Sequence, residues 1–297
     1  MDNIIIIDDI KIKLSNPNKL LWPELGITKV DYLKYLIYLS PYIIKHAKDR
    51  YLTTIRYPDG YNQKFFYQKK IPSYAPNYVD TCEWKDGSLY INLNKQTTLI
   101  WLGNLASLEF HTTFNKIHNP FYPNNIVFDL DPSQGQVFDQ VIEVALKIYE
   151  TLNKLNIKSY VKTSGATGLQ IYIPIGDKYD YNVARQISKF FAEYFSNKYP
   201  EIITIERLKN KRGKKLYFDY LQMWEGKSII TPYSPRATKY ASISMPLKWE
   251  EVEKGIKPED FTIINAMARL KKMGDLFEPL LNNNNTQDFN FILQEII

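Results

Sequence analysis

Three aspartates carry the clearest chemical signal in this 297-residue sequence. Asp129 and Asp131 stand two residues apart in VFDLDP, between apolar neighbours. Residues i and i+2 of a strand share a face and lie roughly 7 Å apart, so both carboxylates would point the same way. Two such carboxylates repel each other unless a cation lies between them. Oxygen ligands of this kind suit Mg²⁺ or Mn²⁺, while two solvated acids at a strand end are the plainer alternative.

A third aspartate strengthens the metal interpretation. Asp219 lies in KKLYFDYLQ, which reads as an apolar strand with the acid in its middle. An unpaired carboxylate is costly there, which favours a partner cation over an aspartate bonded only to backbone amides. Three acids from two strands predict a site for two divalent ions that supports phosphoryl or nucleotidyl transfer.

Two further motifs have the composition of phosphate-binding segments. In TSGATGLQIY, Ser164 and two glycines form a turn whose amides and hydroxyl could cradle a phosphate, although an ordinary hairpin turn fits equally well. In GKSIITPYSPRA, Lys227 and Arg236 could meet a triphosphate, although basic surface residues are usually only solvated.

The composition is that of a folded protein with room for one large domain or two intimate ones. The net charge of +6 is compatible with a polyanionic partner. A single cysteine, Cys82, excludes an internal disulfide and a cysteine-rich zinc site, and three histidines disfavour a histidine-built metal centre. The N-terminus lacks a basic n-region, and no apolar run reaches the ~18 residues of a membrane helix, so we expect a cytoplasmic protein without a membrane partner.

The elements that must position these motifs mix strands and helices without regular alternation. This mixture predicts an α+β fold with largely antiparallel sheets flanked by helices. Thr28, with Asp31 three residues later, predicts a capping box at a helix start. Helices are further predicted over 96–108, 138–155 and 181–198, and strand pairs over 53–70, 81–94 and 158–175. We expect one domain over 1–281, then an Asn-rich linker and a short C-terminal helix over 282–297.

The order of the motifs resembles the polymerase domain of bacterial ligase D, in the archaeo-eukaryotic primase superfamily. The resemblance rests on FDLDP, on SGxxGLxxY, and on a strand aspartate followed by GK(x)₄PYSxR. It extends over nearly the whole chain through NPNKLLWPELGITKVDYLKYL, RYPDGYNQKFFYQK and WLGNLASLEFHTTF. It implies a primase-polymerase fold of two intimately packed α/β modules, one of them an RRM-like catalytic module.

The same resemblance implies an activity and its partners. The activity is a template-directed nucleotidyltransferase that extends primers and fills short gaps at DNA double-strand breaks in non-homologous end joining, with a preference for ribonucleotides. The implied cofactors are two divalent ions, Mn²⁺ or Mg²⁺. The implied partners are nucleoside triphosphates, Ku, a DNA ligase, and DNA with gaps or 3′ overhangs that carries a 5′-phosphate, which places the protein at the nucleoid.

The resemblance also assigns roles to individual residues. Thr167 and Gln170 stand where the family often has lysine and histidine; glutamine can still donate a hydrogen bond, but it carries no charge. We expect one of the two phenylalanines below to be buried. The implied roles are metal binding and catalysis for Asp129, Asp131 and Asp219, nucleotide binding for His111, Ser164, Gln170, Lys227 and Arg236, binding of a DNA 5′-phosphate for Lys19 and Lys29, and stacking on template or base for Phe65 and Phe66.

Two alternative functions stay open on the sequence alone. One is a primase that starts strands de novo, and the other is a non-catalytic module that binds DNA ends. Retention of all three aspartates argues against the non-catalytic module. It does not separate a gap-filling polymerase from a primase, because both need the same acids.

Overall fold

The computed structural model describes residues 3–296, without the side chains of Asn283 and Ile296. The chain divides into two compact units, each assembled from separate stretches. The first unit holds the chain up to Thr113 together with 228–244 and 259–274. The second unit holds 114–227, 245–258 and the chain from Asp275 onward.

The first unit is built on a four-stranded antiparallel sheet in the order β15-β9-β5-β6. Its strands are β5 (Leu52–Arg56), β6 (Phe66–Gln68), β9 (Ser107–Thr113) and β15 (Ser228–Ile230). Three two-stranded pairs join β1 (Ile4–Ile7) to β2 (Ile10–Lys13), β3 (Leu20–Trp22) to β4 (Ile27–Thr28), and β7 (Thr81–Glu83) to β8 (Leu89–Ile91). The predicted strand pairs over 53–70 and 81–94 are therefore confirmed.

Helices α1 (Lys29–Ala47), α2 (Gln96–Asn104) and α6 (Ala266–Met273) complete the first unit. Helix α1 begins with the predicted capping box, because the Thr28 side chain accepts from the amide of Asp31 and the Asp31 side chain accepts from the amide of Thr28. Helix α2 ends earlier than the predicted residue 108. The chain reverses at Ala106, whose φ is 58°, and enters β9 at Ser107.

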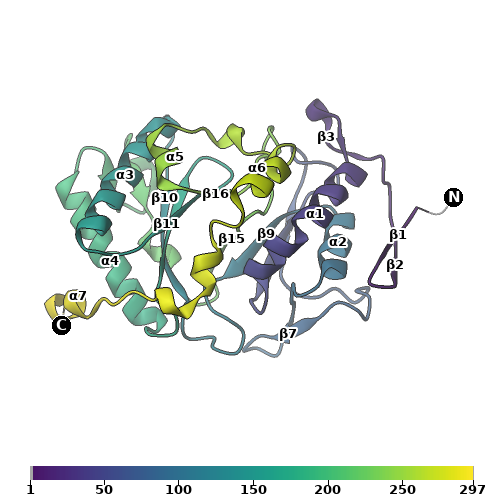
Figure 1. Cartoon of the computed structure of the whole chain (residues 1–297), viewed down its shortest axis with the longest axis horizontal. Helices are drawn as coiled ribbons and strands as arrows, with labels where there is room; N and C mark the ends of the chain where they lie inside the picture. The colour runs from purple at the N-terminus through teal and green to yellow at the C-terminus, as the bar shows by residue number, and fades with distance from the viewer. Residues whose placement is uncertain (1–2, 297) are drawn as a thin grey trace. The chain divides into compact units, whose positions relative to one another are not determined.

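The second unit is built on a six-stranded sheet in the order β13-β14-β10-β12-β11-β16. Figure 1 labels three of these strands, β10, β11 and β16. All pairs are antiparallel except β13 with β14. The strands are β10 (Asn125–Asp131), β11 (Tyr160–Thr163), β12 (Leu169–Pro174), β13 (Ile203–Thr204), β14 (Leu216–Phe218) and β16 (Pro246–Leu247). The predicted hairpin over 158–175 is confirmed as β11 and β12.

Helices α3 (Phe138–Lys154), α4 (Tyr181–Lys198), α5 (Trp249–Glu253) and α7 (Asn290–Ile296) belong to the second unit. The predicted helices over 138–155 and 181–198 are confirmed by α3 and α4.

Short 3-10 turns lie at η1 (Pro23–Leu25), η2 (Lys209–Lys211), η3 (Tyr220–Gln222), η4 (Pro258–Asp260), η5 (Glu278–Leu281) and η6 (Asn283–Asn285). Mixed helices and mainly antiparallel strands confirm the α+β prediction.

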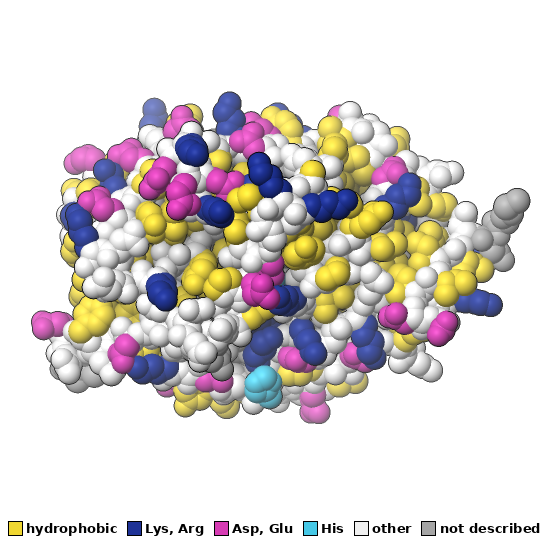
Figure 2. Space-filling model, viewed as in Figure 1, with side chains coloured by type: hydrophobic (Ala, Val, Ile, Leu, Met, Phe, Trp, Pro, Cys, Tyr) yellow, Lys and Arg dark blue, Asp and Glu magenta, His cyan; other side chains and the backbone are white. Residues whose placement is uncertain are grey.

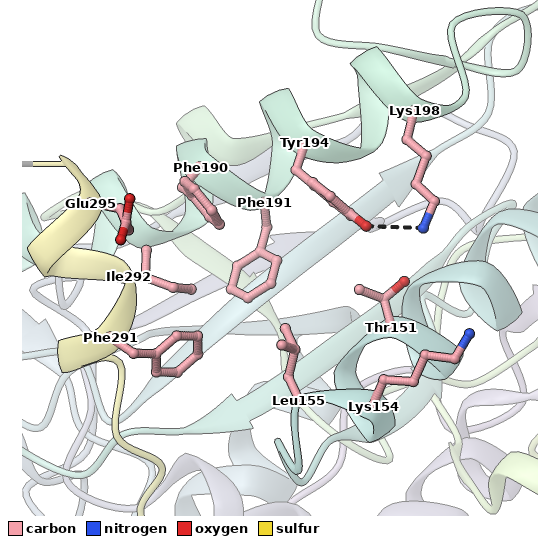
Figure 3. A pocket seen from close by; sticks show the side chains of 10 residues that line it. All are labelled: Thr151, Lys154, Leu155, Phe190, Phe191, Tyr194, Lys198, Phe291, Ile292 and Glu295. Atoms are coloured by element: carbon pink, nitrogen blue, oxygen red, sulfur yellow. Dashed lines mark hydrogen bonds between the residues drawn. The ribbon is translucent and has the colours of Figure 1, made fainter.

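The sheet of the second unit has one apolar face. Phe128 is fully buried, with its ring centroid 5.4 Å from that of Phe191 on α4 and 4.9 Å from that of Phe218 on β14. Residues of α3, α4 and α7, together with Leu155 just after α3, line a common pocket of about 290 Å³. Figure 3 shows these side chains around the pocket, Phe191 among them. The helices therefore cover the Phe128 face, and Asp129 and Asp131, which alternate with Phe128 and Leu130, belong to the opposite face.

The C-terminal stretch packs onto the second unit. Phe289 is fully buried, and its ring lies 6.1 Å from that of Phe191. The amide of Phe289 donates to the hydroxyl of Tyr179 at 2.9 Å. Among the helices of residues 3–296, none has the length and apolar character needed to cross a membrane.

Candidate active site

The three predicted acids lie on neighbouring strands of the second unit. Asp129 and Asp131 occupy the last three positions of β10 together with Leu130. Asp219, predicted to be in mid-strand, instead follows the end of β14 at Phe218 and precedes η3, so that prediction was wrong. The chain turns there, yet the amide of Asp219 still donates to the carbonyl of Asp129 at 3.1 Å, and this keeps the two acids adjacent.

Asp129 has a strongly perturbed pKa. Part of its side chain is accessible, but the protein surrounds the carboxylate closely, and this desolvation is the largest cause that raises the pKa to about 8. The charge of Asp131 raises it further, and Asp219 adds a smaller effect. A hydrogen bond from Gln170 and the charge of Lys162 act in the opposite direction. The site therefore favours either a bound proton or a cation at Asp129.

The donor atoms of this cluster are all carboxylate oxygens, which suit Mg²⁺ or Mn²⁺. Their arrangement is not that of a closed metal site: within residues 3–296, no three His, Cys, Asp or Glu side chains gather as ready-made ligands. The Asp219 carboxylate instead accepts the hydroxyl of Tyr217 at 3.1 Å. The three aspartates thus fit a divalent ion in chemistry and charge, while their side chains stand apart in this structure.

The small-residue turn lies between β11 and β12. The Ser164 hydroxyl oxygen accepts the amides of Ala166 at 3.2 Å and Gly168 at 3.0 Å, so these amides close the turn. A hydroxyl has two acceptor sites and one donor, and its O–H is the group that suits a phosphate oxygen. A Cβ at Gly168 would lie 2.4 Å from the carbonyl of Leu130, so only glycine fits against β10. Lys227 is exposed and lies directly before β15.

Gln170 is held between two charged groups. Its side-chain nitrogen donates to the Asp129 carboxylate at 2.9 Å, and its side-chain oxygen accepts from the ammonium of Lys162. Sequence reasoning missed Lys162, although the predicted hairpin placed it near Gln170 on the facing strand.

In the first unit, His111 and Arg236 meet at a carboxylate that sequence reasoning also missed. Glu109 Oε2 lies 3.0 Å from His111 Nε2 and 3.0 Å from an Arg236 terminal nitrogen. Desolvation opposes the charged form of Glu109, but the hydrogen bond with His111 and the charge of Arg236 outweigh it and hold the Glu109 pKa below its usual value. The available signal was the two-residue spacing in LEFH, which places Glu109 and His111 on one face of β9.

The two lysines assigned to a DNA 5′-phosphate have different surroundings. Lys19 forms an ion pair of 2.6 Å with exposed Asp59. Lys29 is buried, and its ammonium donates to the Ser15 carbonyl at 2.6 Å, to the Ser15 hydroxyl at 3.1 Å, and to the Asn104 carbonyl at 2.9 Å. Desolvation, followed by the charges of Lys19 and Arg56, lowers the Lys29 pKa to about 8.

Phe65 and Phe66 are both exposed, at 53% and 44% of their surface. The expectation that one of them is buried was wrong, because β6 is the edge strand of its sheet. The guanidinium of Arg56 lies over the Phe66 ring, 4.9 Å from its centroid.

The charged side chains around these residues are mixed. On the face shown in Figure 2, basic and acidic side chains of the described residues are interspersed, so the net charge does not form one basic area there. The pocket of Figure 3 is lined by none of the predicted site residues, so we assign it no part in the chemistry.

Comparison with known proteins places these features in a family. The family model described as "LigD, primase-polymerase domain" matches residues 28–277. The chain is 38% identical over 288 residues to the bifunctional non-homologous end joining protein LigD of Bacillus subtilis, covering 96% of this chain and 47% of that protein. It is 28% identical to the multifunctional LigD of Mycolicibacterium smegmatis, covering 91% of this chain and 36% of that protein. The chain thus spans about half the length or less of these relatives.

The fold agrees with this match. The polymerase domain of Mycobacterium tuberculosis ligase D, solved in complex with DNA, superposes with a TM-score of 0.82 at 26% identity, covering 93% of this chain and 99% of that one. The expected family, fold and enzyme class are therefore confirmed. This chain belongs to the primase-polymerase domain family of LigD, a family of DNA-directed nucleotidyltransferases.

Proposed function

We propose that this domain extends primers and fills short gaps at DNA double-strand breaks, with a preference for ribonucleotides. The observation that carries the proposal is that Asp129 and Asp131 lie at the end of β10 and that the Asp219 amide donates to the Asp129 carbonyl, in a member of this family. We assign these three aspartates to two divalent ions, Mn²⁺ or Mg²⁺. When bound, the ions supply charge neutralisation for the triphosphate and lower the pKa of the primer 3′-hydroxyl.

The remaining residues bind and orient the substrates. Arg236 presents a planar guanidinium that suits a triphosphate, and Glu109 fixes both Arg236 and His111. Ser164 offers its O–H, and Lys227 a flexible ammonium, to phosphate oxygens.

The DNA is bound by a separate set of side chains in the first unit. Phe65 and Phe66 offer exposed rings for stacking on template bases, a mode that tolerates any sequence. Lys19 is assigned to the 5′-phosphate on the downstream side of a gap, with Lys29 beside it.

The proposal also includes a pathway and partners, which are taken from the relatives of this chain. The relatives are named as non-homologous end joining proteins and are longer than this chain. We propose the same pathway here, with a Ku-type end-binding protein and a DNA ligase as partners at the nucleoid.

The test is extension of a labelled primer on a gapped duplex that carries a 5′-phosphate, with each metal and each nucleotide type. We expect nucleotide addition that is faster with ribonucleotides and better supported by Mn²⁺ than by Mg²⁺. Asp131→Asn should be inactive, and the exposed Asp9→Asn should match the wild type. Products formed without primer would favour a primase, and DNA binding without addition would favour an end-binding module.

A further inference from the structure

A row of polar side chains crosses the sheet of the second unit at one level. In the antiparallel pairing, Lys162 on β11 stands opposite Gln170 on β12, and Gln170 stands opposite Asp129 on β10. Directly opposed residues of paired strands project from the same face of the sheet. Lys162, Gln170 and Asp129 therefore belong to one continuous row, and their side chains are connected in that order by hydrogen bonds.

The direction of these hydrogen bonds is fixed by the groups at the two ends. An ammonium only donates and a carboxylate only accepts. The Gln170 amide must therefore turn its oxygen to Lys162 and its NH₂ group to Asp129, as the structure has it. Without the ammonium, the amide could rotate its oxygen toward the carboxylate and remove the donor from Asp129.

Lys162 is a buried cation at one end of this row. Its relative exposure is 0%, and a buried ammonium is costly unless other groups compensate it. The Lys162 ammonium donates to the side-chain oxygen of Gln170 and lies 5.6 Å from the centroid of the Tyr172 ring. Through the Gln170 amide, this cation is connected to the Asp129 carboxylate.

We propose that Lys162 is a positioning residue for Asp129 and acts through the Gln170 amide. The proposal rests on the assignment of Asp129 as a metal ligand under the proposed function. Groups that orient a metal ligand typically change metal affinity by about 10- to 100-fold when they are removed. Lys162 would then explain how this chain uses an uncharged glutamine at position 170. The positive charge is on β11, one strand further from Asp129 than Gln170 on β12.

The first experiment measures Mn²⁺ affinity by calorimetric titration in the absence of DNA and nucleotide. Lys162→Met and Gln170→Leu should each weaken Mn²⁺ binding by about 10-fold or more. The double variant should bind Mn²⁺ more tightly than the product of the two single effects would give, because Lys162 acts largely through Gln170. Lys158→Met, which removes an exposed lysine from the same segment, should bind Mn²⁺ like the wild type.

A second experiment needs no metal. Denaturant unfolding of the wild type, the two single variants at Lys162 and Gln170, and the double variant yields the coupling between Lys162 and Gln170 in the metal-free chain. We expect measurable coupling, and we expect Lys162→Met to stay folded, because an apolar side chain of similar volume removes the cost of a buried charge. Reduced stability of Lys162→Met with unchanged Mn²⁺ affinity would mean a purely structural lysine and would overturn the proposal.

The two experiments separate this proposal from the metal assignment. Coupling in a wild-type chain that does not bind Mn²⁺ would support the Lys162–Gln170 link and refute the metal site. Tight Mn²⁺ binding that neither Lys162→Met nor Gln170→Leu changes would refute the positioning role alone.

Discussion

The backbone amide of Asp219 donates to the backbone carbonyl of Asp129 at 3.1 Å, which joins two acids from different strands. Because this bond uses only main-chain atoms, exchange of either side chain leaves the strand pairing in place. The acids can therefore be tested one at a time without loss of the sheet.

We expect Asp129→Ala, Asp131→Ala and Asp219→Ala each to abolish nucleotide addition while DNA binding persists. Each removes a carboxylate from the proposed metal cluster, and none removes a cation that could bind DNA. Primer extension and anisotropy titration on the same gapped duplex measure the two properties. Extension at the wild-type rate by any one variant would contradict the role given to that aspartate.

The raised pKa of Asp129 predicts a pH-dependent effect of metal on stability. Between the ordinary value of 3.8 and the folded value of about 8, the folded chain binds more protons at this group than the unfolded chain does. The contribution of Asp129 to stability therefore falls as pH rises through this window. Divalent metal replaces the proton, so Mn²⁺ should raise Tm more at about pH 8 than at about pH 6.

Thermal unfolding with and without Mn²⁺ at both pH values checks this expectation. Asp129→Asn cannot ionise, so the difference between the two pH values should shrink in that variant. An equal Mn²⁺ effect at both pH values in the wild type would show that no proton competes with the metal.

The ion pair of Lys19 with Asp59 predicts a graded response to a DNA 5′-phosphate. Both side chains are partly exposed, and such a pair is worth only about 0–1 kcal/mol, so a dianionic phosphate can displace Asp59. Lys19→Met should remove the preference for a phosphorylated gap over a hydroxyl-ended one, and Asp59→Asn should increase it. Anisotropy titrations with the two DNAs measure the ratio of affinities; a ratio near one for the wild type would exclude the assignment of Lys19 to the 5′-phosphate.

Lys29 needs a different test, because its ammonium already donates to two carbonyls and a hydroxyl. Lys29→Met should lower the free energy of unfolding, since it leaves these buried acceptors without their donor. The lowered folded pKa of about 8 means that, between about pH 8 and 10.5, the unfolded chain holds more protons at this group. The wild type should therefore gain stability relative to Lys29→Met as pH rises through this window, as denaturant unfolding would measure.

Local patterns in the sequence were sufficient for most elements. The capping box at Thr28 and the alternation around Asp129 both depend on near neighbours, and both agree with the structure. Asp219 was misplaced because the apolar run continues past the end of β14, where the chain turns into η3. The expectation that one of Phe65 and Phe66 is buried was wrong because exposure at a sheet edge depends on strand order, which no local sequence pattern gives.

The two residues missed at the candidate site depend on long-range pairing. The role of Glu109 depends on Arg236, which is far away in the sequence and contacts Glu109 only in the folded unit. The role of Lys162 depends on strand register, because pairing of β11 with β12 and of β12 with β10 connects Lys162 through Gln170 to Asp129. Glu109 and Lys162 are charged residues among buried strand neighbours, and their partners can be identified only once the fold is known.

Glu109 supports a last prediction, on the binding of the triphosphate. Glu109→Gln keeps the size of the side chain but removes the charge that holds His111 and Arg236. Hydrogen bonds to charged groups are worth about 1.5–3 kcal/mol, so we expect KM for the nucleotide to rise about 10-fold or more, with a smaller change in kcat. Steady-state kinetics on a gapped duplex measure both constants, and the exposed Glu201→Gln is the matched control.

Because the charged form of Glu109 is favoured in the folded chain, its stabilising effect is present above its unfolded pKa of about 4.5 and is lost as pH falls through its lower folded pKa. The variant should therefore lose part of the acid sensitivity of the wild type, and an unchanged KM together with an unchanged acid transition would show that Glu109 positions neither partner.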